Sequence, residues 1–171
     1  MTRGSVHLRA LEPEDIDFLF AVENQAKWLS LTAHKVPLSR FVLEQYLAEA
    51  QLPLEQTKQF RFGVDHSKNG LVGLIDLYDF DPHHRRAAVA IVTAEQFQGH
   101  GYALQSLQAL ETYVRDVLNI HQLYAEVLED NVAAKQLFEK YHYQPTATFK
   151  DWWFAQGKFH NIQLYQKFIH D

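Results

Sequence analysis

A glycine-rich turn before a long amphipathic segment narrows the folds open to this chain more than any other feature. The chain has only 7 glycines, and Gly99 and Gly101 stand between an apolar, strand-like segment (85–93) and the segment 102–118. Glycine lets backbone N–H groups approach a ligand without a side chain in the way. A helix N-terminus adds unpaired N–H donors and the positive end of the helix dipole. The pattern predicts a strand–turn–helix unit that can hold a phosphate group, with a plain change of chain direction as the alternative.

The segments around this unit alternate between strand-like and helix-like patterns. Their order, β α α β β β α β α β β, predicts a single α/β domain over residues 1–171. We expect a mixed, mostly antiparallel central sheet flanked by about four helices. The strands are expected at 6–11, 59–65, 71–81, 85–93, 121–128 and on either side of Gly157 within 145–168. The helices are expected at 12–26, 38–51, 102–118 (with Leu104, Leu107, Leu110, Val114 and Val117 at helical spacing) and 131–143.

Composition excludes several classes of site. The chain has no cysteine, so disulfides, thiolate metal sites and a cysteine nucleophile are excluded. No apolar run approaches the roughly 20 residues of a membrane span, so we expect a cytoplasmic protein without a membrane segment. The net charge of −5 argues against nucleic acid as the main partner and weakly favours a cationic substrate. None of the 10 histidines has ligand spacing, so we expect no metal.

Two other phosphate-binding patterns fit the glycine turn poorly. A dinucleotide fingerprint needs a third glycine, and Leu104 stands where it would fall. A P-loop ends in Gly-Lys followed by Ser or Thr, whereas Gly101 is followed by Tyr102. The turn therefore belongs to neither of these nucleotide-binding classes.

The segment from Gln98 to Ala103 resembles the pyrophosphate-binding motif of the GNAT family of N-acetyltransferases, Gln/Arg-x-x-Gly-x-Gly/Ala. Asn131 and Ala134 match the family's Asn-x-x-Ala, and "LFEKYHY" stands where the family has a Tyr-x-x-x-Gly-Phe ending. "FAQGKFHN" resembles the late hairpin of the branch that contains spermidine and ribosomal-protein acetyltransferases. The resemblance covers most of the chain. It implies a GNAT domain that moves an acetyl group from acetyl-CoA to a primary amine by direct attack in a ternary complex.

The resemblance also implies where acetyl-CoA binds. Its diphosphate would lie on the backbone N–H groups of the glycine turn, and its amide-rich pantetheine arm would pair with the preceding strand. His100 would add a phosphate contact when protonated, or would be an exposed loop residue. The expected cofactor-binding residues are Ile91, Val92, Thr93, Gln98, Gly99, His100, Gly101, Tyr102, Ala103, Leu104, Asn131, Ala134 and Phe138.

Acetyl transfer needs a base, because an amine is mostly protonated at neutral pH. The resemblance makes Glu126, in "YAEVLEDN", the candidate base, and alternation points it away from the apolar side of its strand. A solvent-facing or ion-paired glutamate is the alternative. A backbone N–H near Val92 would stabilise the oxyanion. Phe138 stands where the family has its tyrosine acid, so Tyr141 becomes the candidate acid, with a packing role as the favoured alternative and water as another donor.

The acceptor stays open between two classes of amine. Similarity to the polyamine branch makes spermidine a candidate, but His34 and Lys35 stand about where acids are expected, and Ala88 replaces a further acid. The remaining candidate cation binders are Asp76, Asp79 and Asp81, for which a solvated position on the strand or turn is the favoured alternative. The competing acceptor is a protein N-terminus or another small amine.

Phe138 also favours a hypothesis of another class, a non-catalytic acyl-CoA-binding protein. Four aromatic residues have open roles, because they could wall the acceptor site, fill the core or make a contact in a homo-oligomer. They are Trp28, Trp152, Trp153 and Phe154.

Overall fold

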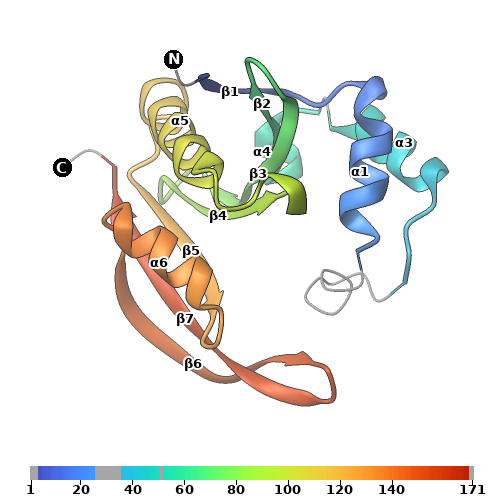
Figure 1. The fold of residues 1–171 in the computed structure, drawn as a ribbon. Helices are drawn as coiled ribbons and strands as arrows, with labels where there is room; N and C mark the ends of the chain where they lie inside the picture. The colour runs from blue at the N-terminus through green and yellow to red at the C-terminus, as the bar shows by residue number, and fades with distance from the viewer. Residues whose placement is uncertain (1–3, 26–35, 51, 170–171) are drawn as a thin grey trace.

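The computed structural model describes residues 4–25, 36–50 and 52–169, which form one seven-stranded sheet with helices packed on it (Figure 1). The strand order is β1-β2-β3-β4-β5-β7-β6, and every neighbouring pair is antiparallel except β4 with β5. The predicted mixed, mostly antiparallel sheet is therefore confirmed. Its strands are β1 (Val6–Ala10), β2 (Phe60–His66), β3 (Gly70–Asp81), β4 (Arg86–Thr93), β5 (Gln122–Leu128), β6 (Gln144–Ala155) and β7 (Lys158–Phe168).

The helices follow the predicted order, with two short additions. The expected helix at 12–26 begins as a 3-10 turn, η1, and neither the one-turn α4 nor the 3-10 helix η2 was predicted. None of the helices in the described ranges is long and apolar enough to cross a membrane. The helical elements are η1 (Pro13–Asp15), α1 (Ile16–Glu23), α3 (Arg40–Glu49), α4 (Leu54–Thr57), η2 (Glu95–Phe97), α5 (Tyr102–Asp116) and α6 (Val132–Lys140).

The larger part of the core lies between the sheet and α5. Leu107, Leu110 and Val114 of this helix are fully buried against the central strands, which confirms most of the predicted apolar stripe. Val117 was expected on the same stripe, but it follows the last helical residue and is exposed. A second cluster joins α1 and α3 to the sheet, with Leu19 and Leu43 buried.

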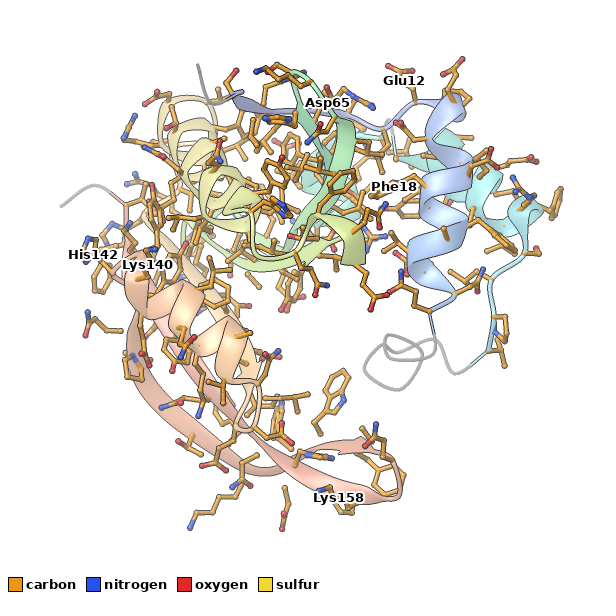
Figure 2. The ribbon with its side chains drawn as sticks, in the orientation of Figure 1. Glu12, Phe18, Asp65, Lys140, His142 and Lys158 are labelled. Carbon is orange, nitrogen blue, oxygen red and sulfur yellow. The ribbon has the colours of Figure 1, made fainter. Side chains whose placement is uncertain are left out.

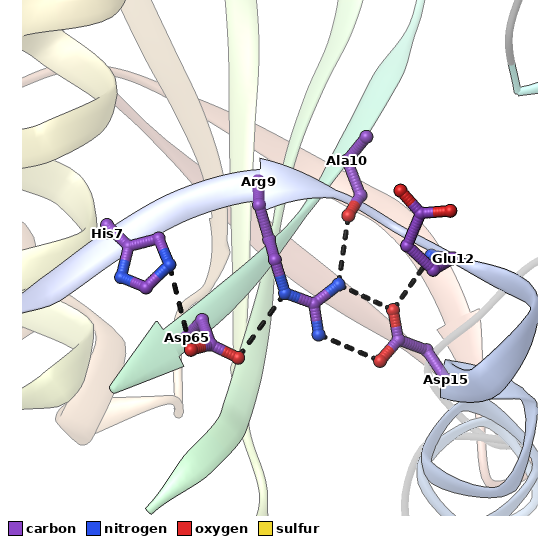
Figure 3. Close-up of polar contacts among 6 residues, drawn as sticks. All are labelled: His7, Arg9, Ala10, Glu12, Asp15 and Asp65. Carbon is purple, nitrogen blue, oxygen red and sulfur yellow. Dashed lines mark hydrogen bonds and ion pairs between the residues drawn. The ribbon is translucent and has the colours of Figure 1, made fainter. Parts of the chain in front are cut away.

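A network of ion pairs ties β1 to the start of α1 (Figure 3). Arg9 donates from Nη1 and Nη2 to the two carboxylate oxygens of Asp15, at 2.7 and 2.9 Å, and from Nε to Asp65 on β2, at 3.3 Å. Asp15 also accepts from the backbone N–H of Glu12, at 2.8 Å. Because Asp15 immediately precedes α1, this network fixes where the helix leaves the sheet.

The parallel pair at the centre of the sheet separates after three residues. Arg86, Ala87 and Ala88 of β4 pair with β5, and the pairing ends there within these fully described strands. β4 continues to Thr93 paired only with β3, so its β5-facing edge from 89 to 93 carries backbone groups without a strand partner. A gap therefore opens between the two strands, on the side where the glycine turn and α5 follow.

The C-terminal hairpin, β6–β7, forms the curved arm at the bottom of Figure 1. Ala155 pairs with Lys158 across a two-residue loop in which Gln156 and Gly157 both have positive φ, 51° and 79°. Two such residues characterise a type I′ turn, whose twist suits a hairpin. The predicted turn at Gly157 is confirmed.

Candidate active site

A groove of about 780 Å³ lies beside the glycine turn and runs along α6; we call it the glycine-turn groove. Gly99 and Gly101 line it with φ of 77° and 82°, and a Cβ atom built on either residue meets nothing within 4 Å. The left-handed backbone explains why glycine stands at both positions. The open space beside them leaves the main chain accessible to a ligand.

The end of α5 that faces the groove has free backbone donors. Gly101 is the N-cap, and it supplies no side chain to cap the helix. The first N–H that donates along the helix belongs to Gln105, which bonds to Gly101 C=O at 3.2 Å, so the N–H groups of residues 102–104 lie before it. Such uncapped donors at a helix N-terminus favour an anion.

Side chains around the turn divide into groove and packing residues. Gln98 and Thr93 line the groove, and the Gln98 side chain donates to Thr93 C=O at 3.1 Å. His100 is absent from the groove lining, and its Nδ1 lies 2.9 Å from Gln98 C=O. Lys140, at the C-terminal end of α6 (Figure 2), is the one lysine or arginine among the described groove residues. Sequence reasoning missed it, because a lysine late in a helix looks like ordinary surface.

The groove continues into a cavity of about 310 Å³ between the separated strands, which we call the strand-gap cavity. Asn131, the N-cap of α6, lines both spaces, and its side chain accepts from the Ala134 N–H at 3.1 Å. The residues of β4 that line the cavity are those beyond its pairing with β5. The two spaces share Ile91, Leu128, Asn131, Ala134 and Leu137. Two further residues that were predicted to bind the cofactor, Val92 and Phe138, line the cavity but not the groove.

Glu126 projects from β5 into the strand-gap cavity. Its neighbours Ala125 and Val127 are buried, whereas the Glu126 side chain keeps exposed surface, as alternation predicted. Partial burial raises the pKa of the Glu126 carboxyl, and the charge of Asp79 adds to this rise. A carboxylate with a raised pKa in a cavity suits proton transfer near neutral pH.

The structure does not bring Tyr141 to the same place. It lines neither the groove nor the cavity, and its ring lies under Lys167, whose Nζ is 4.0 Å from the ring centroid. Phe138, by contrast, is 4% exposed and lines the cavity between the core and the open strands. The role of Tyr141 as an acid stays a prediction, and its surroundings are those of a packing residue.

The four aromatic residues also have different surroundings. Trp153 lines the strand-gap cavity, whereas Trp152 and Phe154 are 59% and 53% exposed and line none of the spaces described here. Trp28 lies outside the described residues, as do His34 and Lys35. Only Trp153 can therefore be placed beside the candidate base.

A third space, of about 380 Å³, joins the strand-gap cavity from the side of α1 and α3; we call it the acceptor pocket. Arg61 lies between the two spaces and donates to both oxygens of Asp76, at 2.5 and 2.9 Å, and to Glu23. Burial is the largest single influence on the pKa of Arg61 and would lower it, but the charge and hydrogen bonds of Asp76, together with the charge of Glu23, raise the pKa further, so the guanidinium stays charged. The spaces share Glu23, Arg61, Asp76, Tyr78 and Ala90.

The three candidate cation binders do not gather at this pocket. Asp76 lines it but is paired with Arg61, Asp79 accepts from Tyr124 Oη at 3.4 Å, and Asp81 lies 3.6 Å from Arg86. A β-bulge between Tyr78 and Asp81 breaks the alternation that would align these acids. These contacts are those of paired strand and turn residues, the favoured alternative, and a role of the three acids in binding a cation stays a hypothesis.

Sequence reasoning also missed Arg61, Glu23 and Tyr78. The only signal for the first two would have been a pairing between residues far apart in the chain, which one sequence does not reveal. Burial raises the pKa of Tyr78, and the charge of Glu126 adds to the rise, so this phenol stays protonated where the pocket meets the cavity.

Among the described residues, no group of three or more His, Asp or Glu side chains could hold a metal ion. The predictions of no metal, no nucleic acid, a cytoplasmic location and a homo-oligomer stay predictions.

The acetyltransferase (GNAT) domain family matches residues 5–144 of the chain. A spermidine N(1)-acetyltransferase from Vibrio cholerae is 26% identical over 156 residues, which are 91% of this chain and 88% of the relative. Its counterpart from Escherichia coli K12 is 27% identical over 157 residues, 92% of this chain and 82% of the relative. The crystal structure of the Vibrio cholerae spermidine N-acetyltransferase in complex with CoA and spermine has a TM-score of 0.86 at 24% identity, with 96% of this chain and 95% of that chain covered. That likeness establishes the fold.

Proposed function

The chain belongs to the acetyltransferase (GNAT) domain family, and on that premise we propose that it moves an acetyl group from acetyl-CoA to a primary amine of the polyamine class. One observation supports this proposal most strongly: the strand-gap cavity, which Glu126 lines, shares lining residues with each of the other two spaces. The glycine-turn groove and the acceptor pocket each open into the strand-gap cavity, where Glu126 lies. A cosubstrate and an amine entering from different sides would form a ternary complex there.

The described residues fit acetyl-CoA in three respects. The N–H groups of residues 102–104 and the left-handed glycines form an open cradle for a diphosphate. Lys140 adds a cation to the groove. The unpaired edge of β4 from 89 to 93 suits the amides of the pantetheine arm, which would continue the sheet as an extra strand.

Acetyl-CoA would supply a thioester carbonyl at the strand gap. Glu126, as the carboxylate, would take the proton that the amine nitrogen loses when it bonds to the carbonyl carbon and the carbon–sulfur bond breaks. A backbone N–H near Val92 would donate to the carbonyl oxygen as it gains charge. Phe138 has no proton to give, so the departing sulfur would be protonated by water.

The polyamine class rests on the names of the relatives and on the charge of the acceptor pocket. Both relatives are named spermidine N(1)-acetyltransferases. In the pocket, Glu23 and Asp76 face one guanidinium, that of Arg61, so one net negative charge remains where a second ammonium of the acceptor would lie.

The same ion pairs favour a second candidate, an amine without a further positive charge. Because Arg61 binds both carboxylates, an incoming ammonium finds neither of them free. A protein N-terminus or small monoamine would need only the base and the cavity. A non-catalytic acyl-CoA-binding protein is disfavoured, because the chain belongs to a family of acetyltransferases and keeps a carboxylate in the cavity.

Free thiol released from acetyl-CoA, followed with a panel of amines, tests the proposal. Spermidine, a monoamine of similar length and peptides with free N-termini are supplied separately at equal concentration. We expect the highest kcat/KM with spermidine. Turnover confined to peptides or to the monoamine would transfer the conclusion to the second candidate, and thiol release with no amine at all would contradict acetyl transfer.

A further inference from the structure

Trp153 carries a buried hydrogen-bond donor that has no partner among the described residues. Its indole Nε1 is shielded from solvent and bonds to no side-chain or backbone acceptor there. The same side chain lines the strand-gap cavity with Glu126 and Phe138. Buried polar groups in proteins almost always have a partner, so a lone donor at a cavity calls for an acceptor that arrives with a ligand.

A bulge in β6 gives Trp153 this position. Phe149 pairs with Ile162 and Trp153 with His160, so four steps along β6 oppose two steps along β7. Inside the bulge Asp151 has φ of 50°, and its N–H donates to Asn161 Oδ1 at 3.0 Å. A bulge re-aims the side chains that follow it. Trp152 consequently lies outside on the ring of Phe149, 5.0 Å between centroids, while Trp153 reaches the cavity.

The α6 side of the cavity is mostly apolar. Phe138, Leu137 and Ala134 line it there and offer no hydrogen-bonding group. Among the described lining residues, the neutral side-chain donors besides Trp153 are the amide of Asn131, at the N-cap of α6, and the phenol of Tyr78, on β3. An indole N–H does not give up its proton at ordinary pH, but it donates a hydrogen bond well. It therefore suits an atom that gains negative charge during the reaction without needing protonation by the enzyme.

We propose that the Trp153 indole N–H is the hydrogen-bond donor that this chain supplies to the acyl-thioester end of its cosubstrate, binding either the carbonyl oxygen or the sulfur. The inference rests on the proposed use of acetyl-CoA. The donor would orient the thioester and stabilise the charge that develops on it.

Indole proton resonances of the ¹⁵N-labelled protein test this inference without turnover. The chain has 3 tryptophans, which single Trp→Phe variants assign. We expect the Trp153 resonance to move downfield when acetyl-CoA is added without an amine, and the Trp152 resonance to stay. A shift with acetyl-CoA but not with CoA assigns the carbonyl oxygen, and a shift with both assigns the sulfur. Calorimetric binding of acetyl-CoA with an unmoved Trp153 resonance would overturn the inference alone; absence of binding would overturn the proposed cosubstrate as well.

Kinetics of Trp153→Phe give a second readout, since phenylalanine keeps an aromatic ring and removes the N–H. We expect kcat to fall about 10- to 100-fold, with the melting temperature unchanged or raised, because an unpaired buried donor is lost. Trp152→Phe is the matched control, and its kcat should equal that of the wild type. A Trp153→Phe protein with normal kcat, or one whose kcat falls only together with its melting temperature, would make Trp153 a packing residue and overturn the inference.

Discussion

At the scale of single residues, Glu126 is the proposed base, a role that requires its carboxylate form. Because its pKa is raised by burial and by Asp79, the carboxylate is lost at a higher pH than an ordinary glutamate as the solution is acidified. Glu126→Gln keeps the shape and removes the base. We expect kcat/KM to fall about 10²–10⁴-fold from mildly acid to neutral pH, with a deficit that shrinks at alkaline pH, where free amine is abundant. Equal pH–rate profiles for the two proteins would remove Glu126 as the base.

Asp79→Asn tests the electrostatic contribution to the raised pKa of Glu126, which adds to the larger contribution of burial. Asparagine tolerates the φ of 49° at this position, and the change removes one negative charge from the surroundings of Glu126. The acid limb of the pH–rate profile should therefore move to lower pH, while the alkaline rate stays. An unmoved limb would mean that another group controls it.

Stability provides the control for both variants. A carboxyl with a raised folded-state pKa contributes stability below its unfolded pKa, and that contribution is lost as pH rises through the folded value. Glu126→Gln should thus keep or raise the melting temperature at neutral pH. A loss of rate in such a protein reports chemistry and not unfolding.

Gly101 allows an equally direct test of the glycine-turn groove. Gly101→Val places a side chain beside the free N–H groups of α5, and its left-handed φ adds strain of about 1–2 kcal/mol. Gly70→Val is the matched control, because Gly70 has a similar left-handed φ of 66° and equally open space but lies at the β2–β3 turn and lines none of the three spaces. By calorimetry, we expect only the Gly101 variant to lose affinity for CoA at least tenfold. Equal affinities in both folded variants would contradict phosphate binding at the turn.

What the sequence predicted for single residues depended on local geometry. The glycine turn, the alternation around Glu126 and the N-cap Asn131 are properties of neighbouring residues, so they could be predicted. His142 stands where the resemblance has glycine, and it adopts φ of 66°, the left-handed position that glycine usually takes after a helix. Arg61 with Glu23 could not be predicted, because residues far apart in the chain meet there only once the sheet has formed.

At the scale of elements, the network around Arg9 determines how α1 meets the sheet. Asp15 is 9% exposed, and the pKa of its carboxyl is lowered by hydrogen bonds from Arg9 and from the Glu12 N–H. Arg9→Met would leave this carboxylate without its guanidinium, so we expect a loss of about 2–3 kcal/mol, below the figure for a fully buried pair because Arg9 is partly exposed. Denaturant unfolding at neutral pH measures it.

The pH dependence of that loss has a defined sign. A lowered folded-state pKa contributes stability above the unfolded pKa of an aspartate, and the contribution is lost as pH falls through the folded value. The difference between wild type and Arg9→Met should therefore shrink in acid. Arg115→Met, which breaks an exposed pair with Asp116, is the control and should leave unfolding unchanged. A difference that persists at low pH would assign the loss to packing of the Arg9 side chain.

The elements that the sequence did not predict are those without periodicity. The four helical segments and seven strands have apolar patterns long enough to recognise, whereas α4 spans one turn and η1 replaces the first turn of an expected helix. The bulges in β3 and β6 have no local pattern either, yet they separate Asp79 from Asp76 and aim Trp153 at the cavity. Periodicity thus predicts the scaffold, and the irregular residues that depart from it form much of the site.

At the scale of the whole molecule, two sets of charges act on a cationic ligand: the net charge of the chain at long range and the ion pairs of the acceptor pocket at short range. The chain carries a net charge of −5, which draws positive ligands from a distance, while Arg61 offsets one of the two negative charges of the acceptor pocket at close range. Long-range attraction is screened by salt, with a Debye length of about 10 Å at 0.1 M and about 3 Å at 1 M. A contact inside the pocket is screened much less.

These two ranges can be separated by the salt dependence of the acceptor's KM. If a polyamine is the acceptor, the KM for spermidine should rise several-fold between about 0.05 and 0.5 M salt, more steeply than that for a monoamine, because spermidine carries more charge; kcat should stay constant. Asp76→Asn removes the pocket's remaining net negative charge, so it should raise the KM for spermidine at every salt concentration and leave that for the monoamine nearly unchanged. Lys158→Gln, at the hairpin tip (Figure 2), makes the whole molecule more negative by one charge and the pocket no different. In that control, any effect should be a lower KM for spermidine that disappears at high salt. The contrary result would be equal KM values for the two amines at all salt concentrations, with Asp76→Asn affecting both alike. It would show that Arg61 already neutralises the carboxylates that a second ammonium would need, and that the acceptor is an amine without a second charge.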